Sequence, residues 1–193
     1  TTPWTLPANV AVTLAEDAHY VGVKLGDGRV LVLAEELVSA VAAVAGWESP
    51  AIVGPRVKGS ELAGLHYAQP VHDGVSGVII TGEHVDLSTG TGAVHTAPGH
   101  GDEDYLVGMK FGLRMPMPVL DDGTFDAGGG PFAGMNVWEA NPRIIEWLGE
   151  RGTLVASAKI AHSYPHCWRC KQPVIFRATE QWFVSMERTQ LRE

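Results

Sequence analysis

The sequence Gly90-Thr91-Gly92-Ala93-Val94-His95-Thr96-Ala97-Pro98-Gly99-His100-Gly101-Asp102-Glu103-Asp104-Tyr105 is the most informative stretch of this chain. It is too polar and too rich in glycine to serve as ordinary core. Glycine lets a ligand approach the main chain closely, and histidine and aspartate add directional polar contacts. The pattern predicts a strand at residues 93–95 and a helix at residues 103–111 with Asp102 as its N-cap. We therefore expect chemistry or recognition at this stretch.

Outside this stretch, alternating apolar residues and turn signals predict a domain that is mainly β. Strands are expected at residues 10–14, 20–25, 29–33 and 153–160, with further strands and turns in 50–82. Helices are expected at residues 35–45, stopped by Gly46, and from Asn141-Pro142 onward. The predicted fold is a β-barrel core with a few short helices over residues 1–160, followed by a C-terminal segment, 161–193.

Composition limits the classes of function. The net charge is −8, with acidic residues concentrated in residues 1–150 and a basic excess in 151–193. An acidic body argues against broad, non-specific nucleic-acid binding, although the basic end could touch a backbone locally or simply be solvated. No apolar run approaches 18 residues, so a membrane partner is not expected. The abrupt ends favour a domain of a longer cytoplasmic protein.

The N-terminal stretch Thr1-Thr2-Pro3-Trp4-Thr5-Leu6-Pro7-Ala8-Asn9 is the second unusual segment, called the threonine strap below. Its prolines restrict the backbone, and its threonine hydroxyls both donate and accept hydrogen bonds. Such a strap suits a small polar ligand. The alternative interpretation is a simple linker.

Four segments of the chain resemble one known family. The strap, residues 90–105, His162-Ser163-Tyr164-Pro165-His166-Cys167-Trp168-Arg169 and Phe176-Arg177-Ala178-Thr179-Glu180-Gln181-Trp182-Phe183 are similar to bacterial isoleucyl-tRNA synthetases. The resemblance covers the editing domain, also called CP1, which is inserted into the catalytic domain. Valyl and leucyl relatives carry Arg-Pro after the paired threonines, where this chain has Pro3-Trp4.

The resemblance implies hydrolysis of valine wrongly esterified to the isoleucine tRNA. One methylene is too little for a single pocket to discriminate well, isoleucyl-tRNA synthetases being the standard example, so a second sieve is needed. The implied partners are mischarged tRNA(Ile) carrying valine and the remainder of the synthetase chain.

The resemblance also assigns roles to residues. Asp104 would bind the substrate ammonium, a natural partner for a carboxylate, although it could instead be a first-turn helix acid. His95 would shape the pocket and restrict larger side chains. The other strap residues would contact substrate, order water or wall the pocket: Thr1, Thr2, Trp4, Thr5 and Asn9. Catalysis would depend on Asp104, His95, Thr1 and Thr2, with no cofactor and no covalent intermediate.

Metal binding provides one further prediction and one rival. Cys167 and Cys170, with His162 and His166 nearby, resemble half of a zinc site that the full-length parent could complete. The rival function is a metal-dependent hydrolase, whose ligands would be His95, His100, Asp102 and Asp104. A further alternative is a non-catalytic tRNA-docking module that uses the basic end, namely Arg169, Lys171, Arg177, Arg188 and Arg192.

Overall fold

The computed structural model describes residues 2–158, 163–189 and 191, and its strands form two sheets. The four-stranded sheet has the order β5-β6-β1-β7, from β5 (His66–Ala68), β6 (Ser76–Thr81), β1 (Ala11–Leu14) and β7 (Ala93–Thr96). The three-stranded sheet has the order β3-β2-β4, from β3 (Val30–Ala34), β2 (His19–Lys24) and β4 (Ala51–Lys58). Among the described residues, no strand of one sheet pairs with a strand of the other, so the strand pairing does not form a closed barrel.

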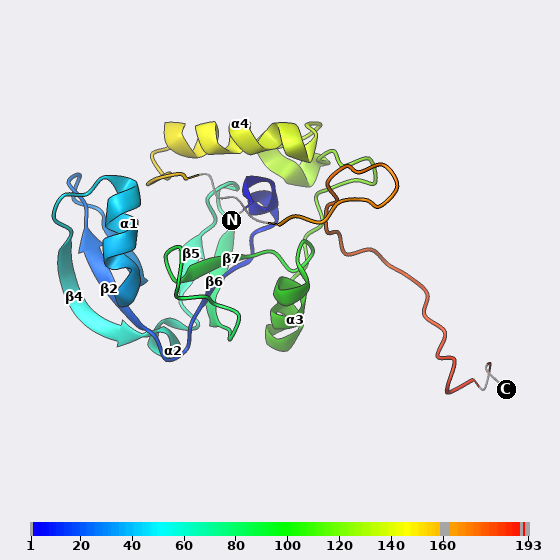
Figure 1. Cartoon of the computed structure of the whole chain (residues 1–193), viewed down its shortest axis with the longest axis horizontal. Helices are drawn as coiled ribbons and strands as arrows, with labels where there is room; N and C mark the ends of the chain where they lie inside the picture. The colour runs from blue at the N-terminus through cyan, green and yellow to red at the C-terminus, as the bar shows by residue number, and fades with distance from the viewer. Residues whose placement is uncertain (1, 159–162, 190, 192–193) are drawn as a thin grey trace.

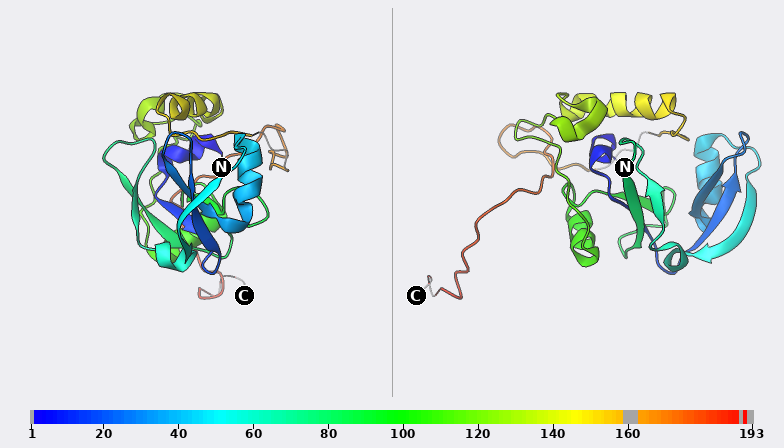
Figure 2. Two further views of the ribbon diagram at one scale, coloured as in Figure 1. Left: turned by 90° about the vertical axis from the view of Figure 1, so that its left-hand side faces the viewer. Right: turned by 180° about the vertical axis from the view of Figure 1, so that it is seen from behind.

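Short helices surround the sheets (Figures 1 and 2). They are α1 (Val38–Ala45), α2 (Gly59–Leu62), α3 (Asp102–Phe111) and α4 (Val137–Glu150), with 3-10 helices η1 (Pro3–Ala8), η2 (Glu35–Leu37) and η3 (Ala127–Phe132). Helix α1 lies beside the three-stranded sheet, α4 lies along η1, and α3 packs beside the four-stranded sheet. The prediction of a mainly β domain with a few short helices is confirmed. No helix among the described residues is long and apolar enough to cross a membrane.

Strand β1 is the centre of the molecule. It pairs with β6 in parallel and with β7 in antiparallel orientation, and its Thr13 hydroxyl bonds the Thr96 hydroxyl at 2.6 Å. A parallel pair needs a long crossover connection, and here that connection contains the whole second sheet. The pairing of β1 with β7 therefore places the strap before β1 close to the glycine-rich loop after β7.

The main hydrophobic cluster packs the strap against α4. Its buried members are Trp4, Val71, Val119, Phe125, Phe132, Val137, Ala140 and Ile144. These residues come from η1, α4, η3 and the intervening loops. Burial of the Trp4 ring thus packs η1 against residues more than 100 positions away.

Two predicted helix starts are wrong. Helix α3 starts at Asp102 with Gly101 as its N-cap. Helix α4 starts at Val137, capped by Asn136, because Asn141 is engaged in a tertiary contact with the strap.

The predicted strand at 153–160 is also absent where it is described, in residues 153–158, and residues 159 and 160 lie outside the described part. Thr153 and Leu154 instead donate backbone bonds to the Leu148 carbonyl, which caps α4. The expected all-β region at 50–82 contains the additional helix α2.

Gly59 provides a test of this packing. A Cβ at Gly59 would lie 2.1 Å from the Ala15 carbonyl oxygen. This oxygen belongs to the backbone, so it could move away only if the main chain shifted. Gly59→Ala is expected to lower the free energy of unfolding by roughly 2–3 kcal/mol through overpacking. Gly149→Ala is the control, because its Cβ would meet nothing within 4 Å, and it should raise stability by about 0.5–1 kcal/mol. Chemical denaturation measures both, and equal effects would contradict the described packing.

Candidate functional site

The threonine strap is a 3-10 helix held on α4. Pro3 opens η1, and the Trp4 backbone N–H donates to Asn141 Oδ1 at 2.9 Å. The Trp4 ring is 3% exposed and lies edge-on to the His100 ring, with centroids 4.8 Å apart. Trp4 is therefore part of the core beneath the strap, and its role as a substrate-pocket wall stays a prediction. Thr1 lies outside the described residues.

His95 joins the strap to the sheet through both ring nitrogens. Nδ1 lies 2.7 Å from Asn9 Nδ2, and Nε2 lies 2.9 Å from the Thr5 hydroxyl. The Thr5 hydroxyl donates to the Thr2 carbonyl at 2.9 Å. The structure thus brings together four residues predicted for the site: Thr2, Thr5, Asn9 and His95.

The direction of these bonds fixes the state of His95. Asn9 Nδ2 also donates to the Ala11 carbonyl at 3.0 Å, so the amide presents N–H to His95, and Nδ1 must be the acceptor. The proton of the neutral ring is then on Nε2 and is donated to Thr5. Burial lowers the pKa of His95 to about 3, so the ring is neutral at physiological pH. With both nitrogens engaged, His95 orients its neighbours and is not placed to act as a base.

Asp104 lies in the first turn of α3, next to the end of β7. Its Oδ2 accepts the Ala97 N–H at 2.9 Å, two residues beyond His95. Burial raises the pKa of Asp104, an effect that the Ala97 N–H and nearby His84 partly offset. Among the described residues, no cationic group lies within ion-pair distance of this carboxylate. A half-buried carboxylate of this kind is suited to receive a cation from a ligand.

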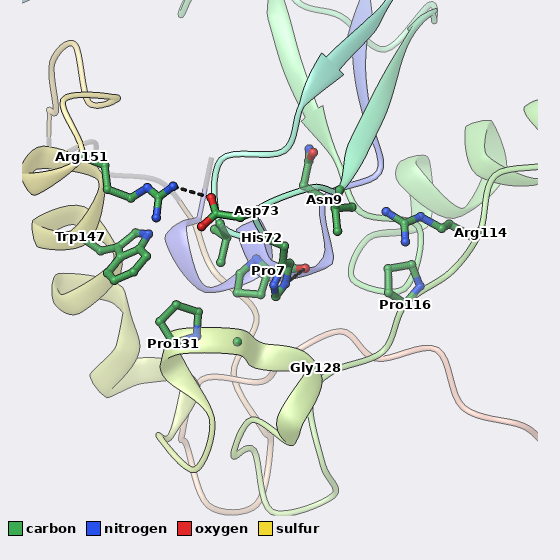
Figure 3. Close-up of a pocket in the computed structure, with 13 residues that line it drawn as sticks. Pro7, Asn9, His72, Asp73, Arg114, Pro116, Gly128, Pro131, Trp147 and Arg151 are labelled. Atoms are coloured by element: carbon green, nitrogen blue, oxygen red, sulfur yellow. Dashed lines mark hydrogen bonds and ion pairs between the residues drawn. The ribbon is translucent and has the colours of Figure 1, made fainter.

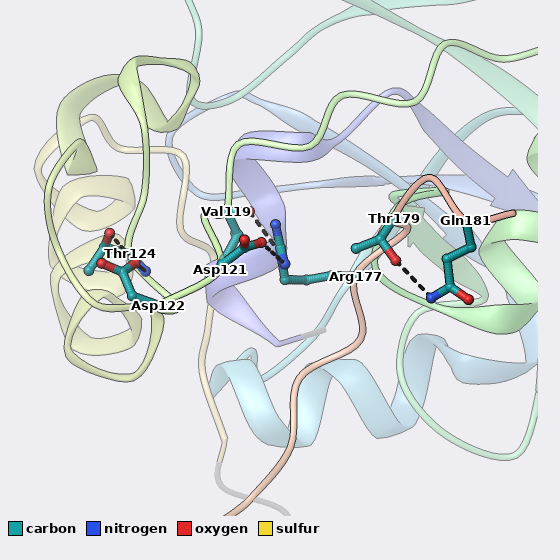
Figure 4. A network of polar contacts seen from close by, with 7 residues as sticks. All are labelled: Val119, Asp121, Asp122, Thr124, Arg177, Thr179 and Gln181. Atoms are coloured by element: carbon teal, nitrogen blue, oxygen red, sulfur yellow. Dashed lines mark hydrogen bonds and ion pairs between the residues drawn. The ribbon is translucent and has the colours of Figure 1, made fainter.

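The glycine-rich loop between His95 and Asp104 is held by the C-terminal segment. The Ala178 N–H donates to the Gly99 carbonyl at 2.8 Å, and His100 Nδ1 bonds the Phe176 carbonyl at 3.0 Å. Between them, Arg177 donates to the Val119 carbonyl and pairs with Asp121 (Figure 4). Beyond this contact the chain leads away from the body (Figure 1). The basic Arg177, predicted as a tRNA contact, is thus engaged within the domain.

Two cavities adjoin the strap. The first has a volume of about 540 Å³, and Figure 3 shows Pro7, Asn9, Arg114, Trp147 and Arg151 around it. The second, of about 670 Å³, lies between the strap and residues 89–94. Neither is lined by His95 or Asp104, so the predicted pocket around these two residues stays a prediction.

The C-x-x-C pair lies in a tight turn of the C-terminal segment. The Cys167 N–H donates to the Gln172 carbonyl, the Lys171 N–H donates to the Cys167 carbonyl, and Lys171 has a left-handed φ of 60°. The backbone N–H groups of Cys170 and Arg169 lower the pKa of the Cys167 thiol, which favours the thiolate that a metal would need. His162 lies outside the described residues. Zinc binding by this half site stays a prediction.

The ligands of the rival metal-dependent hydrolase do not gather. Among the described residues, no three His, Cys, Asp or Glu side chains form an arrangement that could hold a metal ion. Both nitrogens of His95 and the Nδ1 of His100 are bonded within the protein, while Asp102 is exposed. The geometry therefore does not favour that alternative.

Sequence reasoning missed Tyr67 and His84. The Tyr67 hydroxyl donates to Asn9 Oδ1, and His84 has a buried Nε2 without a hydrogen-bond partner close to Asp104. Neither residue lies in a conspicuous motif; strand pairing brings Tyr67 near the site, and His84 lies in the turn after β6. A buried tyrosine facing a glycine across a strand pair was the available signal for Tyr67, but it requires knowledge of the register.

Comparison with known proteins identifies the class first. No protein-family model matches the chain. A crystal structure described as that of GlLeuRS-CP1 superimposes with a TM-score of 0.65 at 16% identity, covering 82% of each chain. This likeness shows the fold, which is that of a CP1 domain.

Sequence similarity then specifies the kind of protein. The chain is 52% identical over 192 residues to the isoleucine--tRNA ligase of Desulfovibrio desulfuricans and 53% identical over 193 residues to that of Thioalkalivibrio sulfidiphilus. The match covers 100% of this chain, which spans 20% of the length of each of these two relatives. The chain is homologous from end to end to one segment of isoleucine--tRNA ligases, which confirms the resemblance.

The protonation state of His95 can be tested directly. Because its pKa is about 3, the ring should not titrate between pH 5 and pH 8, and its two nitrogens should report an Nε2–H tautomer. The ¹⁵N and ¹³C NMR shifts of the ring across this range measure both properties. A titration of His95 near pH 6 would contradict the assignment.

Proposed function

We propose that the chain is the editing segment of a longer isoleucine--tRNA ligase and hydrolyses the ester that joins valine to tRNA(Ile). The observation that carries this proposal is Asp104, a half-buried carboxylate with one oxygen fixed by Ala97 and no ion pair to any described residue. An aminoacyl ester presents a free ammonium group, which Asp104 would bind through a charge-assisted hydrogen bond. The homology to isoleucine--tRNA ligases supports the choice of substrate.

The chemistry needed is modest, because an ester is already reactive. A water oxygen forms a bond to the acyl carbon, the bond from that carbon to the ribose oxygen breaks, and the ribose oxygen takes up a proton. The products are valine and free tRNA. Fixed orientation of the ester and the water supplies the main acceleration.

The residues around His95 divide this work. The neutral imidazole holds Thr5, and Thr5 holds the backbone at Thr2, so the strap keeps one shape while the substrate binds. His95 has no free nitrogen for the water proton. We therefore assign the proton transfer to the vicinal ribose hydroxyl of the substrate and assign water placement to the strap threonines.

Exclusion of isoleucine would follow from the size of the pocket beside His95 and the strap. Valine is smaller by one methylene, and a second sieve needs to reject only the larger side chain. Zinc has no step in this mechanism. If Cys167 and Cys170 bind zinc with ligands from the rest of the synthetase, the metal would have a structural role.

Asp104→Asn tests the proposed ammonium site. The amide preserves shape but loses the charge, so release of valine from Val-tRNA(Ile) by the parent synthetase should fall roughly 10²–10³-fold. Asp102→Asn is the matched control, since it makes the same chemical change in the same helical turn at an exposed position. It should leave the rate within about twofold, as expected for a surface change.

The measurement is release of labelled valine, with circular dichroism to confirm folding. A folded Asp104→Asn variant that retains full activity would remove Asp104 from the mechanism. An equal loss in Asp102→Asn would instead favour the metal-dependent hydrolase. Binding of mischarged tRNA without any release of valine would favour the docking module.

A further inference from the structure

The hydrogen bonds that connect Thr2, Thr5, His95 and Asn9 are called the His95 relay below. The relay continues from Asn9 to Tyr67, a residue that lies outside the sequence motifs. We propose that Tyr67 is a positioning residue for the proposed editing site, and that Gly77 exists opposite it to let its ring reach Asn9. This inference rests on the proposed function for its catalytic consequence. Its structural part, control of the His95 tautomer, can be tested without that function.

The path crosses the four-stranded sheet from one edge strand to the other. Tyr67 is in β5 and faces Gly77 in β6. Asn9 lies two residues before β1, and His95 is in β7. The order of the strands is β5-β6-β1-β7, so the relay follows the sheet strand by strand. Residues separated by 86 positions, Asn9 and His95, are thereby connected to a tyrosine that neither motif contains.

Gly77 makes this path sterically possible. A Cβ built on Gly77 would lie 2.3 Å from both Cζ and the hydroxyl oxygen of Tyr67. The aromatic ring therefore occupies the space that any side chain at residue 77 would need. Because the ring lies over β6 in this way, its hydroxyl reaches the Asn9 amide.

The Tyr67 hydroxyl and the Ala11 carbonyl together hold the Asn9 amide in one orientation. The hydroxyl donates to Asn9 Oδ1, while Asn9 Nδ2 donates to the Ala11 carbonyl and to His95 Nδ1. Asn9 is only 4% exposed, so water does not readily replace a lost partner. Without the Tyr67 donor, Oδ1 would be a buried acceptor with no partner, a costly arrangement that weakens the placement of the amide. A loosely held amide donates less strongly to His95 Nδ1, which lowers the preference of the ring for the Nε2–H tautomer.

Tyr67 is suited to this role because it stays protonated. Burial raises its pKa to about 12, so its hydroxyl remains a donor throughout the pH range in which a synthetase works. A serine in β5 could not span β6, and phenylalanine would span it without a donor. Tyrosine combines a ring long enough to span β6 with a hydroxyl group that donates one hydrogen bond to Asn9 Oδ1.

Tyr67→Phe is the direct test, because it keeps the ring and removes only the hydroxyl. The first measurement is the pair of ¹⁵N shifts of His95, which should converge as the Nε2–H tautomer loses its dominance. Gly77→Ala should produce the same change by displacing the ring. If both folded variants keep the wild-type His95 shifts, the positioning role is overturned.

Two controls separate positioning from general destabilisation. Tyr20→Phe removes another buried phenol, whose hydroxyl donates to the Gly92 carbonyl, and it should leave the His95 shifts unchanged. Gly26→Ala adds a methyl group that meets nothing within 4 Å. If Tyr20→Phe shifted the His95 resonances as much as Tyr67→Phe does, the proposal would fail.

The second measurement is deacylation of Val-tRNA(Ile) by the parent synthetase. Tyr67→Phe should lower kcat about tenfold and change KM less than twofold, since the strap is mispositioned while the ammonium site at Asp104 is intact. Unchanged kcat together with shifted His95 resonances would overturn the catalytic consequence and leave the tautomer control standing. A wild-type synthetase that releases no valine would overturn the proposed function, and the NMR result would still decide the role of Tyr67.

Discussion

The hydrogen bond between the Asn9 amide and His95 Nδ1 is the interaction on which the rest of the site depends. It connects the end of the strap to β7 at the point where both approach β1. Because the amide also bonds the Ala11 carbonyl, its orientation is fixed, and with it the side of the imidazole that carries the proton. The strap conformation then follows, through Thr5 and the backbone of Thr2.

The site combines a neutral hydrogen-bonded array with one carboxylate. Burial lowers the pKa of His95 and raises the pKa of Asp104, so loss of hydration favours the uncharged form of both groups. They differ in their partners. His95 has its hydrogen bonds satisfied within the protein, whereas Asp104 has a single backbone donor and capacity for a cation. His95 therefore fixes the shape of the site, and Asp104 provides its negative charge.

Much of this architecture could be predicted from local sequence. The strand and helix that flank the glycine-rich loop, and the early strands, lie close to their predicted positions, because alternation and turn residues are local signals. Tertiary contacts account for the failures. Asn141-Pro142 has the form of a helix start, yet Asn141 faces the strap, and the sequence offers no sign of a partner 137 positions away. Tyr67 was missed for the same reason, since only register places it opposite Gly77.

The contact between residues 176–178 and the glycine-rich loop has a consequence for how the domain is delimited. A polypeptide ending before Phe176 would remove the acceptor for His100 Nδ1 and the donor to the Gly99 carbonyl. It would also free Arg177 from the Val119 carbonyl. Any minimal fragment intended to preserve the glycine-rich loop between His95 and Asp104 must therefore extend past Ala178.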